Sequence, residues 1–241
     1  MNESTYIPSN TKNIINKDRS LFICLLRSIK TNGLPDKFIE EKFRTTCLYP
    51  NPEMDKEIYA ILPSKNVPKQ TFILYKDCAI LVKKSSYSII DIFINYHLAC
   101  KRNAYYKAMS TLIQKSRNLP LACREYSLIN FGGWNKSQAL WINPAQISDI
   151  HSVTTTRTKL VFNNQLELSL DMKLNTLLSR MKTGFIAYGI IKRDYGSSQN
   201  QLTTPLTDFL NIASTDITNQ LLAQVEYQDI PGKRNDFLSN L

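Results

Sequence analysis

The sequence predicts an α+β fold, and three features of its hydrophobic pattern indicate this class. Short apolar runs separated by turn residues predict strands of a small antiparallel β-sheet. A longer stretch with apolar residues at helical spacing predicts a central helix, and further helical patterns occur near both ends of the chain. With 241 residues and 43% hydrophobic content, the chain is long enough to bury the core of one large domain or two small ones.

Residues 1–55 are predicted to form a helical N-terminal appendage. Their first part is polar, and Asp18 is positioned to cap a helix over residues 19–30. Asn32-Gly33 is a stop signal for that helix, and a second short helix is expected over residues 34–44.

Residues 56–194 are predicted to form the core domain. Six apolar runs are strand candidates, namely residues 57–62, 71–75, 78–82, 121–124, 127–131 and 139–142. A hairpin follows, in which Asn163-Asn164 forms the turn and alternating leucines of residues 166–170 line one face. Asp171 is then positioned to cap a helix over residues 173–192.

Residues 195–241 are predicted to form a polar linker and a C-terminal helix. Thr204-Pro205 opens this helix, because proline is favoured at the first helical position. Apolar residues at helical spacing would give it one buried face: Leu206, Phe209, Leu210, Ile217, Leu221 and Leu222.

Residues 83–117 form the predicted central helix, whose charge is strongly asymmetric. Asp91 is its only acidic residue, against seven basic ones: Lys83, Lys84, Lys101, Arg102, Lys107, Lys115 and Arg117. Tyrosines are interleaved with these cations. A helix with one apolar face and one basic, tyrosine-bearing face can pack on a protein core and contact a polyanion at once. The seven cations are therefore the candidate DNA-binding residues; the alternative is an ordinary solvated basic face.

The overall charge agrees with a polyanionic partner. The formal net charge is +10 and the isoelectric point about 9.3, with most of the excess in residues 83–117. Membrane association is not expected, because the apolar run at residues 21–26 is far shorter than the roughly 20 residues of a spanning helix. That run also lacks a signal-peptide cleavage site, so a cytoplasmic protein is predicted.

Cysteine and histidine usage predicts neither a disulfide framework nor a zinc site. The five cysteines are widely separated, no CxxC occurs, and there are two histidines, His97 and His151. Reduced thiols in the cytoplasm are therefore expected, with no metal and no cofactor.

Catalysis is not predicted, although one enzymatic alternative stays open. Gly132-Gly133 is followed by Lys136-Ser137, but this spacing does not match a phosphate-binding loop. A Mg²⁺-dependent nuclease would need a carboxylate pair with a nearby lysine, which Asp149, Asp171 and Lys173 would supply. A second alternative is a protein-interaction adaptor whose basic face meets an acidic partner.

The order of these segments resembles the competence transcription factor (ComK) family of low-GC Gram-positive bacteria. The resemblance covers a little over half the chain, between Ile58 and about Lys192. It rests on Ile61-Leu62-Pro63, Lys76-Asp77-Cys78, Ser88-Ile89-Ile90-Asp91, Lys101-Arg102, Leu119-Pro120-Leu121, Trp141-Ile142 with Ile147, and Val161-Phe162-Asn163-Asn164. That family usually has a glycine-containing segment before its basic pair, whereas residues 94–100 of this chain contain no glycine.

The chain resembles a divergent member of this family, and the resemblance implies sequence-specific binding of AT-rich double-stranded promoter DNA. It also implies self-association and activation of genes for DNA uptake. A bacterial, cytoplasmic transcriptional activator is thus the expected function, with Lys101-Arg102, in the middle of the predicted helix, at the centre of its DNA-binding site.

Overall fold

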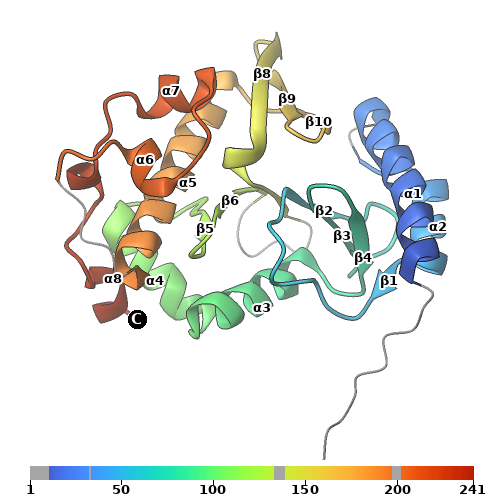
Figure 1. Cartoon of the computed structure of the whole chain (residues 1–241), viewed down its shortest axis with the longest axis horizontal. Coiled ribbons are helices and arrows are strands. Elements are labelled where there is room, and N and C mark those ends of the chain that lie inside the picture. The colour runs from blue at the N-terminus through green and yellow to red at the C-terminus, as the bar shows by residue number, and fades with distance from the viewer. Residues whose placement is uncertain (1–10, 33, 133–138, 197–201) are drawn as a thin grey trace, which may run out of the picture.

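The computed structural model describes residues 11–32, 34–132, 139–196 and 202–241. Within these residues the chain forms a seven-stranded mixed sheet, a three-stranded antiparallel sheet and surrounding helices (Figure 1). The predicted α+β class is confirmed. Gly33 and Gly133, predicted to end a helix and to form a turn, lie outside the described residues. None of the described helices is both long and apolar enough to cross a membrane.

The larger sheet has the strand order β1-β4-β3-β2-β7-β6-β5. The strands are β1 (Leu48–Tyr49), β2 (Ala60–Pro63), β3 (Thr71–Leu74), β4 (Ala79–Val82), β5 (Leu121–Ala122), β6 (Ser127–Phe131) and β7 (Leu140–Ile142). The observed sheet is larger than the small antiparallel sheet that was predicted, because the pairing of β2 with β7 joins strands β1 to β4 and strands β5 to β7 into one sheet. It is also mixed rather than antiparallel, because β1 pairs in parallel with β4. Every residue of β2, β3 and β4 is buried, which explains why these runs are continuously apolar rather than alternating.

The smaller sheet consists of β8 (Ile147–Thr154), β9 (Arg157–Phe162) and β10 (Glu167–Leu170), after a short 3₁₀ turn, η1 (Pro144–Gln146). The predicted hairpin is confirmed between β9 and β10. Asn164 Oδ1 accepts a hydrogen bond from the Leu166 amide at 3.1 Å, and Leu160 pairs with Leu168 on the buried face.

The N-terminal helices α1 (Thr11–Asn32) and α2 (Lys37–Thr46) lie beside the β1 end of the larger sheet (Figure 1). Asp18 lies inside α1, so its predicted capping role is wrong, whereas Asp36 caps α2 by accepting from the Ile39 amide at 2.9 Å. The ring of Phe43 meets that of Phe72 edge to face at 5.2 Å, which packs α2 onto β3. Because β1 belongs to the sheet, the predicted appendage is continuous with the core.

The C-terminal part consists of α5 (Leu174–Tyr195), α6 (Leu206–Leu210), α7 (Asp216–Leu222), η2 (Tyr227–Asp229) and α8 (Asp236–Ser239). The single predicted C-terminal helix is wrong, because the left-handed backbone of Asn211 ends α6 and a capping box at Thr215 begins α7. Asp171 does not cap α5. That helix begins after Lys173, and Asp171 instead pairs with Arg157 at 2.9 Å.

The predicted central helix is two helices, α3 (Ser86–Leu98) and α4 (Arg102–Ile113). Ala99 adopts a left-handed conformation (φ 51°, ψ 32°), and its amide still donates to the Asn95 carbonyl. A continuous helix over residues 83–117 would be about 50 Å long and would carry its second half past the core. The break instead redirects the chain back onto the core, so that Tyr105 and Met109 of α4 are fully buried. Neither glycine nor proline marks the position in the sequence.

Replacing Ala99 by glycine is expected to raise the free energy of unfolding by about 1 kcal/mol, because glycine adopts the left-handed region without a Cβ penalty. The control is Ala104→Gly inside α4, where glycine should lower stability by about 1 kcal/mol. Urea unfolding of both variants measures the difference. Equal destabilisation would contradict a helix break at Ala99.

Candidate nucleic-acid interface

Arg102 begins α4 rather than lying in the middle of a helix, which corrects the predicted position of the basic pair. Its guanidinium lies 3.4 Å from the ring centroid of Tyr87, and its Nη1 lies 3.4 Å from a carboxylate oxygen of Asp91. The Arg102 side chain is 15% exposed, and burial lowers the pKa of its guanidinium. Arg102 therefore fastens α4 to α3, and little of it is presented to an external partner.

Four of the other predicted cations lie on separate segments. Lys83 and Lys84 connect β4 to α3, and the Lys84 carbonyl accepts a hydrogen bond from Thr71. Lys101 is the N-cap residue of α4 and Lys107 follows within that helix; both are exposed. These residues are accessible to a polyanion, but they lie on two segments separated by α3 and the helix break.

Lys115 and Arg117 are the two predicted cations that the fold brings together with further binding groups. They line a cavity of about 440 Å³ between the segment after α4 and the first half of α5. The α5 wall provides a third cation and several hydrogen-bonding groups. The lining residues include Lys115, Arg117, Asn118, Asn175, Ser179, Arg180 and Thr183.

The two walls of this cavity are fastened by side-chain hydrogen bonds. Asn130 of β6 donates through its side-chain Nδ2 to the Leu119 carbonyl at 3.0 Å, and the backbone carbonyl of Asn130 accepts from Arg180 Nη1 at 2.8 Å. Lys115 Nζ donates to Thr183 Oγ1 at 2.8 Å, which joins the first wall to α5. The segment after α4 can turn into this position because Gln114 and Asn118 adopt positive φ angles of 55° and 53°.

The electrostatics of the cavity favour an anion. Three cations line it, and none of its described lining residues carries a carboxylate. Arg180 is half-buried over the ring of Phe131, and burial lowers the pKa of its guanidinium. Lys173, the N-cap residue of α5, makes no side-chain capping hydrogen bond, so the positive end of this 22-residue helix dipole is not neutralised by a capping side chain. Phosphate oxygens suit such a site.

The residues of α5 that line the cavity were not predicted as site residues, although the sequence contains a pattern that marks them. Asn175, Ser179 and Thr183 recur at a spacing of four residues, and Arg180 lies beside them. This is a polar stripe on a helix whose opposite side is apolar; Asn175 and Ser179 are exposed and Thr183 is buried, so the stripe marks a surface with hydrogen-bonding capacity. The stripe shares no sequence neighbourhood with Lys115 and Arg117, so only the fold joins them.

The residues of the alternative nuclease site are not brought together. Asp149 on β8 pairs with His151 at 2.9 Å, while Asp171 beyond β10 pairs with Arg157. Strand β9 lies between β8 and β10. In the described residues, neither aspartate belongs to a cluster of three potential metal ligands. The geometry needed to hold Mg²⁺ between them is therefore absent from this arrangement.

The structural role of Arg102 can be separated from charge by comparing two neighbouring variants. Arg102→Ala should lower the free energy of unfolding by about 1–2 kcal/mol, since it removes a largely buried cation–π contact. Lys101→Ala removes the same charge from an exposed side chain and should change stability by less than about 0.5 kcal/mol. Thermal or urea unfolding measures both; equal effects would contradict a fastening role for Arg102.

Comparisons of the chain with known protein families, with curated proteins and with solved structures find no match. The function is therefore inferred from the residues and from the geometry of the cavity lined by Lys115, Arg117 and Arg180.

Proposed function

We propose that this protein is a DNA-binding regulator of transcription that holds the phosphate backbone in the cavity between the end of α4 and α5. The observation that carries the proposal is the convergence of Lys115, Arg117 and Arg180 on one cavity of about 440 Å³, free of carboxylates among its described lining residues. Phosphate contacts of this kind position a protein on a duplex.

Each group in the cavity has a different part in binding phosphate. Arg117 is exposed, and its planar guanidinium can form two parallel hydrogen bonds to one phosphate. Lys115 and Arg180 are already held in place by Thr183 and Asn130, so little of their conformational freedom is lost on binding. The exposed Lys101 and Lys107 belong to α4, the helix that ends just before Lys115, and would add further phosphate contacts.

The regulatory part of the proposal draws its support from the sequence. The likeness to the competence transcription factor family favours AT-rich promoter DNA, self-association and activation of DNA-uptake genes. An exposed arginine such as Arg117 also suits the narrow minor groove of AT-rich DNA, whose negative potential attracts guanidinium groups.

Lys115→Ala/Arg117→Ala should weaken binding to an AT-rich duplex and make the dependence of log Kd on log salt shallower by about 2, since two phosphate contacts are lost. For the wild type, a plot of the logarithm of the association constant against the logarithm of the salt concentration should have a slope of about −4 or steeper. Lys65→Ala/Lys182→Ala removes the same charge from two exposed residues that do not line the cavity, and should leave the slope nearly unchanged. Fluorescence anisotropy over a salt series measures all three proteins. Equal slopes for the two double variants would refute the proposed site.

The alternative functions give different results in a second experiment. Asp149→Ala and Asp171→Asn should bind DNA like the wild type, and plasmid incubated with wild-type protein and Mg²⁺ should stay intact. Metal-dependent cleavage that either substitution abolishes would favour the nuclease instead. No shift of AT-rich or GC-rich duplexes in gels, together with binding to an acidic protein partner, would favour the adaptor.

A further inference from the structure

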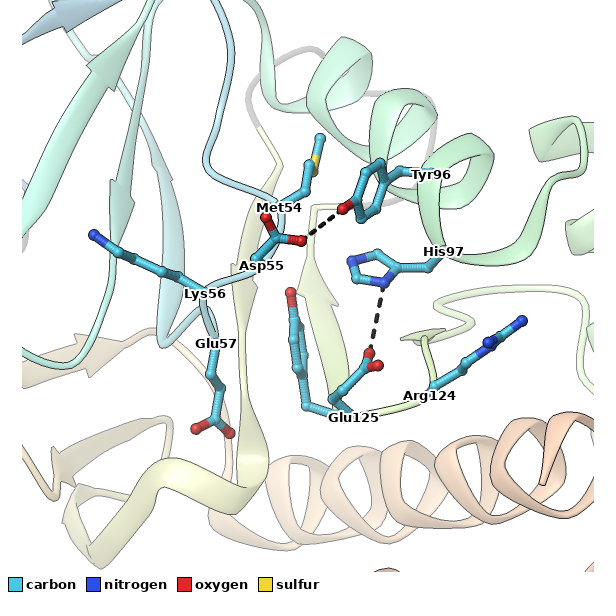
Figure 2. Close-up of a pocket in the computed structure, with 9 residues that line it drawn as sticks. Met54, Asp55, Lys56, Glu57, Tyr96, His97, Arg124 and Glu125 are labelled. Atoms are coloured by element: carbon cyan, nitrogen blue, oxygen red, sulfur yellow. Dashed lines mark hydrogen bonds and ion pairs between the residues drawn. The ribbon is translucent and has the colours of Figure 1, made fainter. Parts of the chain in front are cut away.

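A second cavity, of about 490 Å³, lies where the end of α3 meets the turn between β5 and β6 (Figure 2). His97 comes from the last turn of α3, while Cys123 and Glu125 come from the β5–β6 turn. One potential metal-binding atom from each residue lies within 4.8 Å of the other two. His97 Nδ1 is 3.5 Å from Glu125 Oε2.

His97 is held in place but lacks a complete set of hydrogen bonds. Its side chain is 9% exposed, stacks on the Phe93 ring at 5.4 Å and meets the Tyr96 ring edge to face at 5.1 Å. Its Nε2 is buried and has no hydrogen-bond partner in the described structure, and the nearby Tyr126 hydroxyl is in the same state. Buried polar atoms without partners are costly, so two of them beside one cavity indicate a ligand that completes the site.

Cys123 is oriented by the turn that contains it. Its amide donates to the Tyr126 carbonyl at 2.9 Å, which closes the turn, and its thiol donates to the same carbonyl at 3.3 Å. Burial raises the pKa of the Cys123 thiol to about 12, while hydrogen bonds to the sulfur from the backbone of Glu125 and Tyr126 act in the opposite direction. Those backbone groups can hold the sulfur in one orientation toward the cluster.

We propose that His97, Cys123 and Glu125 bind one Zn²⁺ ion, with a fourth coordination position open to the cavity. A combination of imidazole, thiolate and carboxylate ligands suits zinc and disfavours Mg²⁺ or Ca²⁺, which select oxygen. The two anionic ligands balance the charge of the ion. This site differs from the sequence prediction of no metal, because its ligands come from segments that share no metal-binding motif.

The required geometry is within reach of the side chains. Zinc–ligand bonds of about 2.0–2.3 Å in a tetrahedron separate neighbouring ligand atoms by roughly 3.3–3.8 Å. The His97–Glu125 distance of 3.5 Å already lies in this range, and the three ligand atoms lie within 4.8 Å of one another, so the distances to Cys123 have to shorten by at most about 1 Å. In Figure 2, His97 lies between Glu125 and the Tyr96–Asp55 pair, whose oxygens are 2.6 Å apart. Asp55 thus adds a second carboxylate to the lining of the same cavity.

The test uses the full chain without a polyhistidine tag, titrated with Zn²⁺ alone and then with Co²⁺ as a spectroscopic substitute. Calorimetry should give one site per chain, and Co²⁺ should produce a thiolate-to-metal charge-transfer band that Zn²⁺ abolishes. Saturating Zn²⁺ should also raise Tm, since a ligand that binds the native state stabilises it. Absence of both the calorimetric site and the cobalt band would overturn the proposal.

Matched variants assign the ligands. Cys123→Ser should abolish the charge-transfer band, while Cys47→Ser, at an equally buried cysteine, should keep it. Glu125→Gln should weaken zinc binding at least tenfold, whereas Glu41→Gln, at an exposed glutamate of α2, should not. His151→Ala should also leave binding unchanged. Circular dichroism of each apo variant verifies folding. Loss of the band in Cys47→Ser or His151→Ala, with retention in a folded Cys123→Ser, would refute the assignment.

Discussion

The close approach of α5 to β6 at Gly184 is the constraint on which the positions of the binding groups depend. A Cβ atom at Gly184 would lie 2.7 Å from Ile129 Cγ2, so a side chain there would push the helix away from the sheet. One turn before Gly184, Arg180 donates to the Asn130 backbone carbonyl of β6. Thr183, directly before Gly184, accepts a hydrogen bond from Lys115. The Arg180 contact requires α5 at its present distance from β6. The cavity lined by Lys115, Arg117 and Arg180 is thus a consequence of helix–sheet packing rather than of a local motif.

Tyr105 connects the two candidate sites through one buried hydroxyl. Its side chain is fully buried, and its oxygen donates to the Pro120 carbonyl at 3.0 Å and accepts from the Ala122 amide at 2.8 Å. These bonds join α4 to β5. His97 precedes α4 and Lys115 follows it, while Arg117 precedes β5 and Cys123 follows it. The elements that Tyr105 joins therefore carry one site at each end, and burial raises the pKa of its hydroxyl well above its usual range.

The sequence predicts those elements whose pattern is local. The buried strands and the β9–β10 hairpin are confirmed because apolar runs and turn residues act over a few positions. The helix break at Ala99 was not predictable from such patterns, since an alanine in the left-handed region leaves no composition signal. The candidate sites depend on contacts between distant segments, as Arg180 with Asn130 and His97 with Glu125 illustrate. Residue type identified Lys115 and Arg117 as cations, but only the tertiary structure gave them Arg180 as a neighbour.

The pairing of each cation decides its role, which the net charge of +10 does not reveal. Arg193 and Asp194 form a buried pair with side chains 4% and 0% exposed, and Arg193 also donates to the Gly232 carbonyl, so this arginine holds the C-terminal segment. Arg102 is similarly occupied by Tyr87 and Asp91. Such cations have already exchanged water for internal partners, and a phosphate would have to displace those partners to bind them. Lys115, Arg117 and Arg180 line an open cavity whose described lining holds no carboxylate, so their positive potential is still available. An anionic ligand there adds favourable contacts without breaking an ion pair, which is the electrostatic condition for binding a polyanion at moderate salt.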